Sequence, residues 1–171
     1  MASDQEPGAN SNHEVARAAL VQVANLGSVQ STQAIRNIAT AGDPDFQGLA
    51  YVALLRLGDY SLLNAAIRYA EQPGQELEVR RQQSGVAEAI GDIQSRSVLA
   101  TLNSLLASPN VSLRRAAAKA LRNIGDASSM SFLVRALDDN DADVKYEAVM
   151  ALATIVGASA ASVGRSSLCN E

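Results

Sequence analysis

The sequence contains no tryptophan, one histidine and one cysteine, and aromatic residues make up only 4% of its 171 residues. The single cysteine, Cys169, excludes a disulfide framework within the chain, as is usual for proteins of a reducing compartment. The single histidine, His13, lies near the N-terminus and far in sequence from Cys169, which argues against a Cys/His or Ser/His nucleophile. We therefore expect no self-contained catalytic site and classify the chain as a non-enzyme.

Long apolar segments are also missing, since no run approaches the about 18 residues that a membrane span requires. Residues 1–12 are polar and lack the apolar core of a secretory signal, which predicts a disordered leader and a cytoplasmic protein. The formal net charge is −4, so the composition does not favour nucleic-acid binding, which usually needs a basic surface. Alanine and leucine dominate the apolar residues, and this favours closely packed helices over a β-sandwich.

Glycines that follow apolar stretches recur at intervals of 31, 33, 34 and 32 residues. They are Gly27, Gly58, Gly91, Gly125 and Gly157, and aspartate follows three of them, as Asp59, Asp92 and Asp126. Glycine is the preferred left-handed C-cap of a helix, and the adjacent aspartate can cap the next helix. Turn residues divide each interval once more. The sequence therefore predicts about five helix pairs over residues 13–157, followed by a degenerate or truncated tail over residues 158–171.

The second helices of these pairs align in four apolar columns, which are spaced four, four and three residues apart. This spacing places the columns on one helical face, which we expect to form the core. The columns are Val15, Phe46, Val79, Leu113 and Val144; Ala19, Ala50, Gln83, Ala117 and Ala148; Val23, Leu54, Ala87, Leu121 and Leu152; and Leu26, Leu57, Ile90, Ile124 and Ile155. Stacking closes a continuous core, because a single pair cannot bury both of its faces.

Two segments, VSLRRAAAKALRNIGD from Val111 and DVKYEAVMAL from Asp143, resemble HEAT-like repeats of the short kind found in phycobilisome-lyase-like proteins. The resemblance implies an all-α fold, a right-handed α-solenoid or α-α superhelix of about five stacked helix pairs. It further implies that the second helices line a concave surface. In related repeats, the position of Arg80, Arg114 and Lys145 forms a ladder with loop aspartates, and we assign these three a structural role.

Other columns of the second helices point away from the predicted core and include Gly48 and Leu55. In the third to fifth repeats, these columns bring together Arg81, Arg115, Lys119, Arg122, Tyr146 and Met150. Arginine, tyrosine and methionine are typical of interface centres. We therefore predict that these six residues form a partner-binding patch on the concave face. The rival interpretation is an ordinary solvated helix face.

These features favour a protein-interaction scaffold whose concave face binds a protein or peptide, with an acidic or helical segment as the expected partner. The resemblance implies one alternative, a lyase-type accessory subunit that handles a bilin or another cofactor together with a partner chain. Nucleic-acid binding ranks third because the net charge is negative. No cofactor is expected. A di-iron site like that of the HEAT-like deoxyhypusine hydroxylases needs several His-Glu pairs, and this chain has one, His13-Glu14.

One acidic turn has the beginning of a calcium-binding pattern. The spacing of Asp139, Asp141 and Asp143 matches the first three ligands of a calcium loop. However, Val144 and Met150 stand at the positions that require glycine and a bidentate glutamate. We therefore predict no metal site and expect these aspartates to cap the following helix.

Overall fold

The computed structural model describes residues 18, 20, 22, 28–41, 44–74 and 76–166, and every regular element in them is a helix. The predicted all-α fold is therefore confirmed. The chain divides into two compact units, Met1–Val86 and Ala87–Glu171. Within the described ranges, no helix combines the length and apolar character needed to cross a bilayer. The predicted leader, His13 and Cys169 lie outside the described residues.

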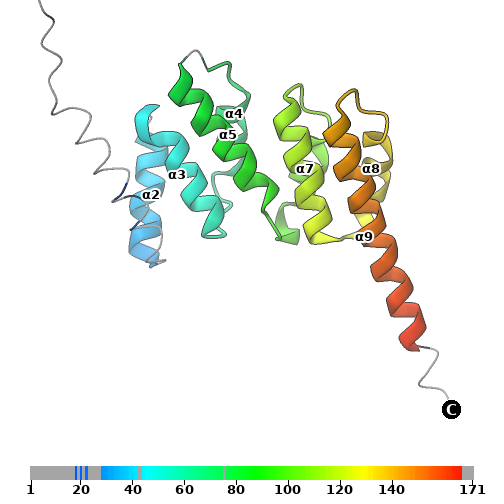
Figure 1. The fold of residues 1–171 in the computed structure, drawn as a ribbon. Coiled ribbons are helices and arrows are strands. Elements are labelled where there is room, and N and C mark those ends of the chain that lie inside the picture. Colours follow the sequence, from blue (N-terminus) through cyan, green and yellow to red (C-terminus); the bar gives the residue numbers. More distant parts are fainter. Residues whose placement is uncertain are drawn as a thin grey trace, which may run out of the picture. The chain divides into compact units, whose positions relative to one another are not determined.

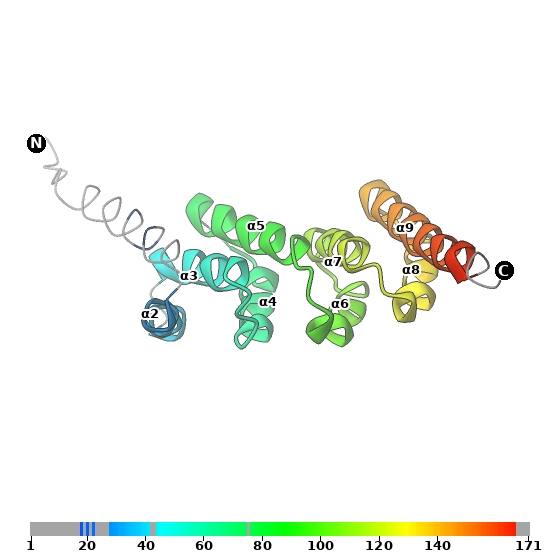
Figure 2. The ribbon, with the colours of Figure 1, turned by 90° about the horizontal axis from the view of Figure 1, so that it is seen from below.

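The first unit contains helices α2 (Val29–Ala41), α3 (Pro44–Arg56) and α4 (Leu63–Glu71), together with the first part of α5 (Leu77–Gly91). Consecutive helices pack as pairs: α2 lies against α3, and α3 also contacts α4. In Figure 2, α2 and α4 lie on one side of this unit, and α3 and α5 lie on the other. The unit thus has the two helical layers that stacked pairs produce.

The second unit contains the end of α5 and two complete helix pairs. The first helix of each pair begins as a 3₁₀ turn, η1 (Arg96–Val98) before α6 (Leu99–Leu105) and η2 (Ala127–Ser129) before α8 (Met130–Ala136). The second helices are α7 (Val111–Ile124) and α9 (Ala142–Ser166). Helix α6 packs on α7, α8 packs on α9, and α7 packs on α9. Figure 1 shows α7 and α9 side by side, with α9 running beyond the end of α7.

Two of the predicted glycine caps are confirmed. Gly58 and Gly125 have φ angles of 75° and 65°, in the left-handed region that favours glycine. After Gly125, the carboxylate of Asp126 accepts a hydrogen bond of 3.0 Å from the Ser128 N–H and so caps η2. Asp59 accepts the corresponding hydrogen bond from the Ser61 N–H.

The cap prediction is wrong at two other glycines. Gly91 is the last residue of α5, where a Cβ would lie 3.1 Å from Cδ of Lys119. This glycine therefore permits close packing against α7. Asp92 forms an ion pair with Lys119, and Ser95 caps η1 in its place. Gly157 lies inside α9, which continues to Ser166. No aspartate follows Gly157 to begin another helix, and glycine alone does not end one.

The predicted core columns are best realised in the second unit. Leu113, Ala117 and Leu121 of α7 are fully buried, as are Val144 and Ala148 of α9. The alanine positions let the helices approach closely, so the core is made of small and branched side chains. The sequence pattern therefore identified most of the buried face of these two helices, but the predicted core residues Ile124 and Leu152 are only half-buried.

In the first unit, the predicted outward columns are wrong, because Gly48 and Leu55 are both buried. At Gly48 the cause is Gln82, a polar residue that is itself buried. Its Oε1 accepts hydrogen bonds from the Gly48 N–H at 3.0 Å and from the Tyr69 hydroxyl at 3.1 Å. A Cβ on Gly48 would lie 2.5 Å from that oxygen. Gly48 thus provides the space in which Gln82 links three helices.

Candidate interaction surface

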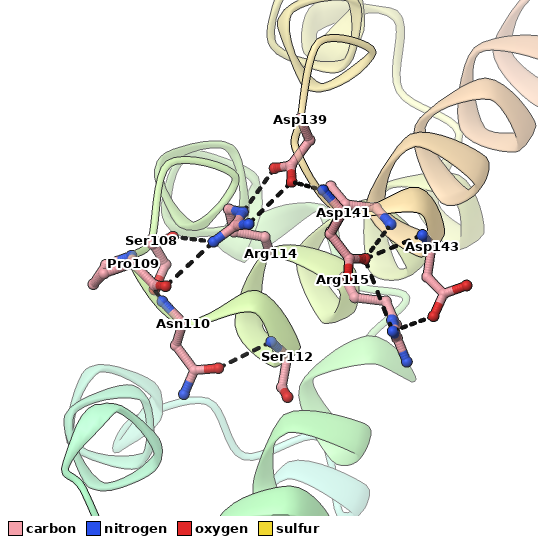
Figure 3. A network of polar contacts seen from close by, with 10 residues as sticks. Ser108, Pro109, Asn110, Ser112, Arg114, Arg115, Asp139, Asp141 and Asp143 are labelled. Carbon is pink, nitrogen blue, oxygen red and sulfur yellow. Dashed lines mark hydrogen bonds and ion pairs between the residues drawn. The ribbon is translucent and has the colours of Figure 1, made fainter.

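The strongest polar contact of the second unit joins one helix pair to the next (Figure 3). Arg114 of α7 donates hydrogen bonds to both carboxylate oxygens of Asp139, at 2.7 and 3.0 Å, from Nε and Nη2. Its Nη1 also donates to the carbonyl oxygens of Ser108 and Pro109. The Arg114 and Asp139 side chains are only 15% and 9% exposed. The Arg114 hydrogen bonds lower the pKa of Asp139, although burial opposes this effect.

The predicted ladder role is therefore confirmed for Arg114 and not for its two equivalents. The side chains of Arg80 and Lys145 are exposed. Neither forms an ion pair with any residue that the structure describes. Among the described residues, this column therefore forms one arginine–aspartate pair, between Arg114 and Asp139.

Five of the six predicted patch residues lie in the second unit, on neighbouring helices. Arg115, Lys119 and Arg122 follow one another along α7, at spacings of four and three residues. Tyr146 and Met150 occupy the matching positions on α9, 31 residues later than Arg115 and Lys119. Spacings of three and four residues place side chains on one face of a helix. We call these five residues the outer surface.

The two apolar members of the outer surface are exposed to solvent. Tyr146 is 59% exposed and Met150 is 37% exposed. Both exposed fractions are larger than those of core residues, and both side chains are large. An exposed tyrosine and methionine on one face can be covered by a partner at little conformational cost. The sixth predicted residue, Arg81, belongs to the first unit, where it forms a 3.9 Å ion pair with Glu78.

The three cations of the outer surface each contact a carboxylate of the same chain. Lys119 pairs with Asp92 at 2.8 Å, and Arg122 pairs with Glu147 at 2.9 Å. These contacts connect α7 to the turn that follows α5 and to α9. They are local to the second unit and lie along the seam between neighbouring helices.

The third cation, Arg115, contacts two aspartates at the start of α9 (Figure 3). It pairs with Asp143 and lies 3.8 Å from Asp141. The three cations thus face four carboxylates, so this set of groups has a formal charge of 3 − 4 = −1. The outer surface is therefore balanced in charge rather than basic, which removes the main electrostatic reason for an acidic partner or for nucleic acid.

The acidic turn before α9 works as a helix cap, as predicted. Asp141 accepts hydrogen bonds from the N–H groups of Asp143 and Val144, at 3.1 and 3.0 Å. Asp139 accepts one from the Asp141 N–H at 2.8 Å. The same Asp139 Oδ1 also accepts a hydrogen bond from Arg114 Nη2, and the same Asp141 Oδ1 lies 3.8 Å from Arg115 Nη2. Within the described ranges, no three His, Cys, Asp or Glu residues are grouped as metal ligands would be.

Neighbouring pairs of helices joined by glycine and aspartate turns define a helical-repeat protein of the α-solenoid class. Residues 78–153 match the family model of HEAT repeats. This part of the chain therefore consists of HEAT-like repeats, and the matched residues include α7, α8 and the first half of α9. The match does not separate the phycobilisome-lyase-like subtype from other HEAT repeats. A search among curated proteins finds no match to this chain.

Proposed function

We propose that this protein is a protein-interaction scaffold and that the outer surface of α7 and α9 binds a partner polypeptide. HEAT repeats generally serve as interaction scaffolds, and this is the function that the family match favours. The observation that carries the proposal is the pair Tyr146 and Met150, which are exposed at matching positions beside Arg115 and Lys119. By likeness to other HEAT repeats, we expect this surface to belong to the concave side.

The arrangement favours a partner of mixed character over a strongly acidic one. An apolar centre of tyrosine and methionine with a rim of ion pairs matches the usual anatomy of a protein interface. The exposed ion pairs at Arg115 and Lys119 stabilise the fold by only about 0–1 kcal/mol each. A partner carboxylate can therefore replace Asp143 or Asp92 with little loss. The partner would bind through apolar contact first and through exchanged ion pairs second.

The experiment compares capture by the native chain with capture by a Tyr146→Ser, Met150→Ser variant. A Leu77→Ser variant is the matched control, because Leu77 is an equally exposed apolar residue on α5. A partner that binds through the outer surface is retained by the native chain and by the control and lost by the double variant. Its affinity is then measured by calorimetry with purified proteins. Equal affinity for all three chains would refute the proposal.

A further inference from the structure

The second helices α7 and α9 are repeat equivalents, offset by 31 residues, yet one face that is buried on α7 is exposed on α9. Positions that face the first helix of their own pair match: Leu113 and Val144 are both fully buried, and so are Ala120 and Ala151. These helices therefore sit in their own pairs in the same way. A difference in burial at other equivalent positions therefore reflects what packs against the other faces of these two helices.

The face of α7 that meets α9 is covered, whereas the same face of α9 is open. Ala118 of α7 is fully buried, but its equivalent Val149 is 53% exposed. Leu121 is fully buried, and its equivalent Leu152 is partly exposed. One turn further along α9, Val156 is also exposed. This face of α9 is therefore both apolar and exposed.

The charged residue at the edge of this face differs in the same way. Arg114 is bound by Asp139, an aspartate from the turn before the next second helix. Its equivalent Lys145 is exposed and forms no ion pair with a described residue. The charge of Lys145 does act on Asp139 and lowers the pKa of that carboxyl, but it is the weakest of several causes. Lys145 can therefore form an ion pair with an aspartate of a helix pair that packs on this face of α9.

We infer that Lys145, Val149 and Val156 form a docking surface, the end surface, for a helix pair of a partner protein. The internal packing of α9 on α7 fixes the chemistry of that partner. It presents a second helix with small apolar side chains on its inner face, as α9 presents Ala148 to the core. It also carries an aspartate just before that helix, which pairs with Lys145 as Asp139 pairs with Arg114. Helix-on-helix docking of this kind is a common mode of recognition.

The end surface differs from the outer surface by its residues and by its partner. Val149 and Val156 lie on the side of α9 that continues the stacking direction, whereas Tyr146 corresponds to Arg115 on the outer surface. A Val149 variant therefore tests the end surface alone, and the Tyr146 and Met150 variant tests the proposed function alone.

The probe for the end surface is a synthetic peptide of residues 126–157, which carries the chain's own α8 and the matching part of α9. We expect this peptide to bind the full chain, and Val149→Asp to weaken binding about tenfold or more, as loss of a central apolar contact usually does. Lys145→Asp is expected to weaken binding as well, and a peptide with Asp139→Lys is expected to restore it. Leu77→Asp is the matched control and should bind normally.

A second measurement covers the case in which the free peptide does not fold. In a tandem chain, residues 126–157 are repeated directly after Gly157, and Val149 is replaced by cysteine in the first copy. We expect a thiol reagent to label Val149→Cys far more slowly in the tandem chain than in the single chain. Equal labelling, or peptide binding that ignores Val149 and Lys145, would overturn the inference. Concentration-dependent dimers of the native chain that Val149→Asp abolishes would also overturn it, by making a second copy the occupant.

Discussion

Removal of Arg114 is the most informative single change to the fold, because this side chain joins two helix pairs. Its guanidinium donates two hydrogen bonds to Asp139 and others to the carbonyls of Ser108 and Pro109. In the Arg114→Ala variant, Asp139 keeps one hydrogen bond, from the Asp141 N–H. A carboxylate that is only 9% exposed is then left without its counter-ion.

The expected cost follows from that burial. Breaking a fully buried ion pair by removing one partner costs about 3–5 kcal/mol, because the remaining charge stays desolvated. Here both side chains keep some contact with water, at 15% and 9% exposure. We therefore expect Arg114→Ala to lower the free energy of unfolding by about 2–3 kcal/mol, below the fully buried range. A drop under about 1 kcal/mol would be typical of a surface pair instead.

The matched control is Arg80→Ala, at the equivalent position of the preceding repeat. The Arg80 side chain is exposed and forms no ion pair with a described residue, so its removal should cost under about 0.5 kcal/mol. Urea denaturation followed by circular dichroism measures both. A double-mutant cycle with Asp139→Asn separates the pair from the arginine's contacts to the backbone. Equal losses of unfolding free energy for Arg114→Ala and Arg80→Ala would refute the argument that the Arg114–Asp139 pair stabilises the packing of one helix pair on the next.

Three further outcomes are expected. Leu121→Ala should cost about 2–5 kcal/mol in urea denaturation, because Leu121 is fully buried. Gly48→Ala should lower the free energy of unfolding by about 1–3 kcal/mol, since its Cβ would lie 2.5 Å from Oε1 of Gln82. The control is Gly85→Ala, whose Cβ would meet its nearest atom at an ordinary 3.6 Å. This change should be neutral or stabilising by up to about 1 kcal/mol. The pKa of Asp139 is lowered in the folded chain, so its contribution is complete above the unfolded value of about 3.9 and is lost as the pH falls through the folded pKa. Acid titration of the Asp139→Asn variant should therefore show a shallower loss of stability than the native chain, and an identical loss would contradict the assignment.

The fold could be predicted from the sequence because its signals are local and repeated. Gly125 followed by Asp126 combines the residue that ends one helix with the residue that caps the next, and both roles are seen. The same reasoning failed at Gly157, because a glycine ends a helix only when the residues after it favour a turn. It failed at Gly48 because burial there depends on Gln82, which is 34 residues away.

The sequence columns selected the residues of the proposed site but not their charge partners. The columns assign Arg115 and Lys119 of α7 to the same repeat positions as Tyr146 and Met150 of α9. They could not show that each cation is paired, because the partners lie 25 to 28 residues away, in a turn or on the next second helix, where the register depends on packing. This separation in sequence equals about one repeat length minus one helical turn. A search for carboxylates at this offset from each outward cation would have found Asp143 for Arg115 and Glu147 for Arg122.

The two paired arginines of α7 differ in burial, and this difference bears on the proposed binding of a partner. The Arg114 pair is nearly buried, so exchanging Asp139 for a partner carboxylate would expose and reorder the turn before α9. The Arg115 side chain is 48% exposed and its partner Asp143 is 62% exposed, so exchange there leaves the turn in place. The adjacent residues Arg114 and Arg115 therefore differ in role because they differ in burial. The inner one joins one helix pair to the next, and we propose that the outer one can exchange Asp143 for a partner carboxylate without loss of the fold.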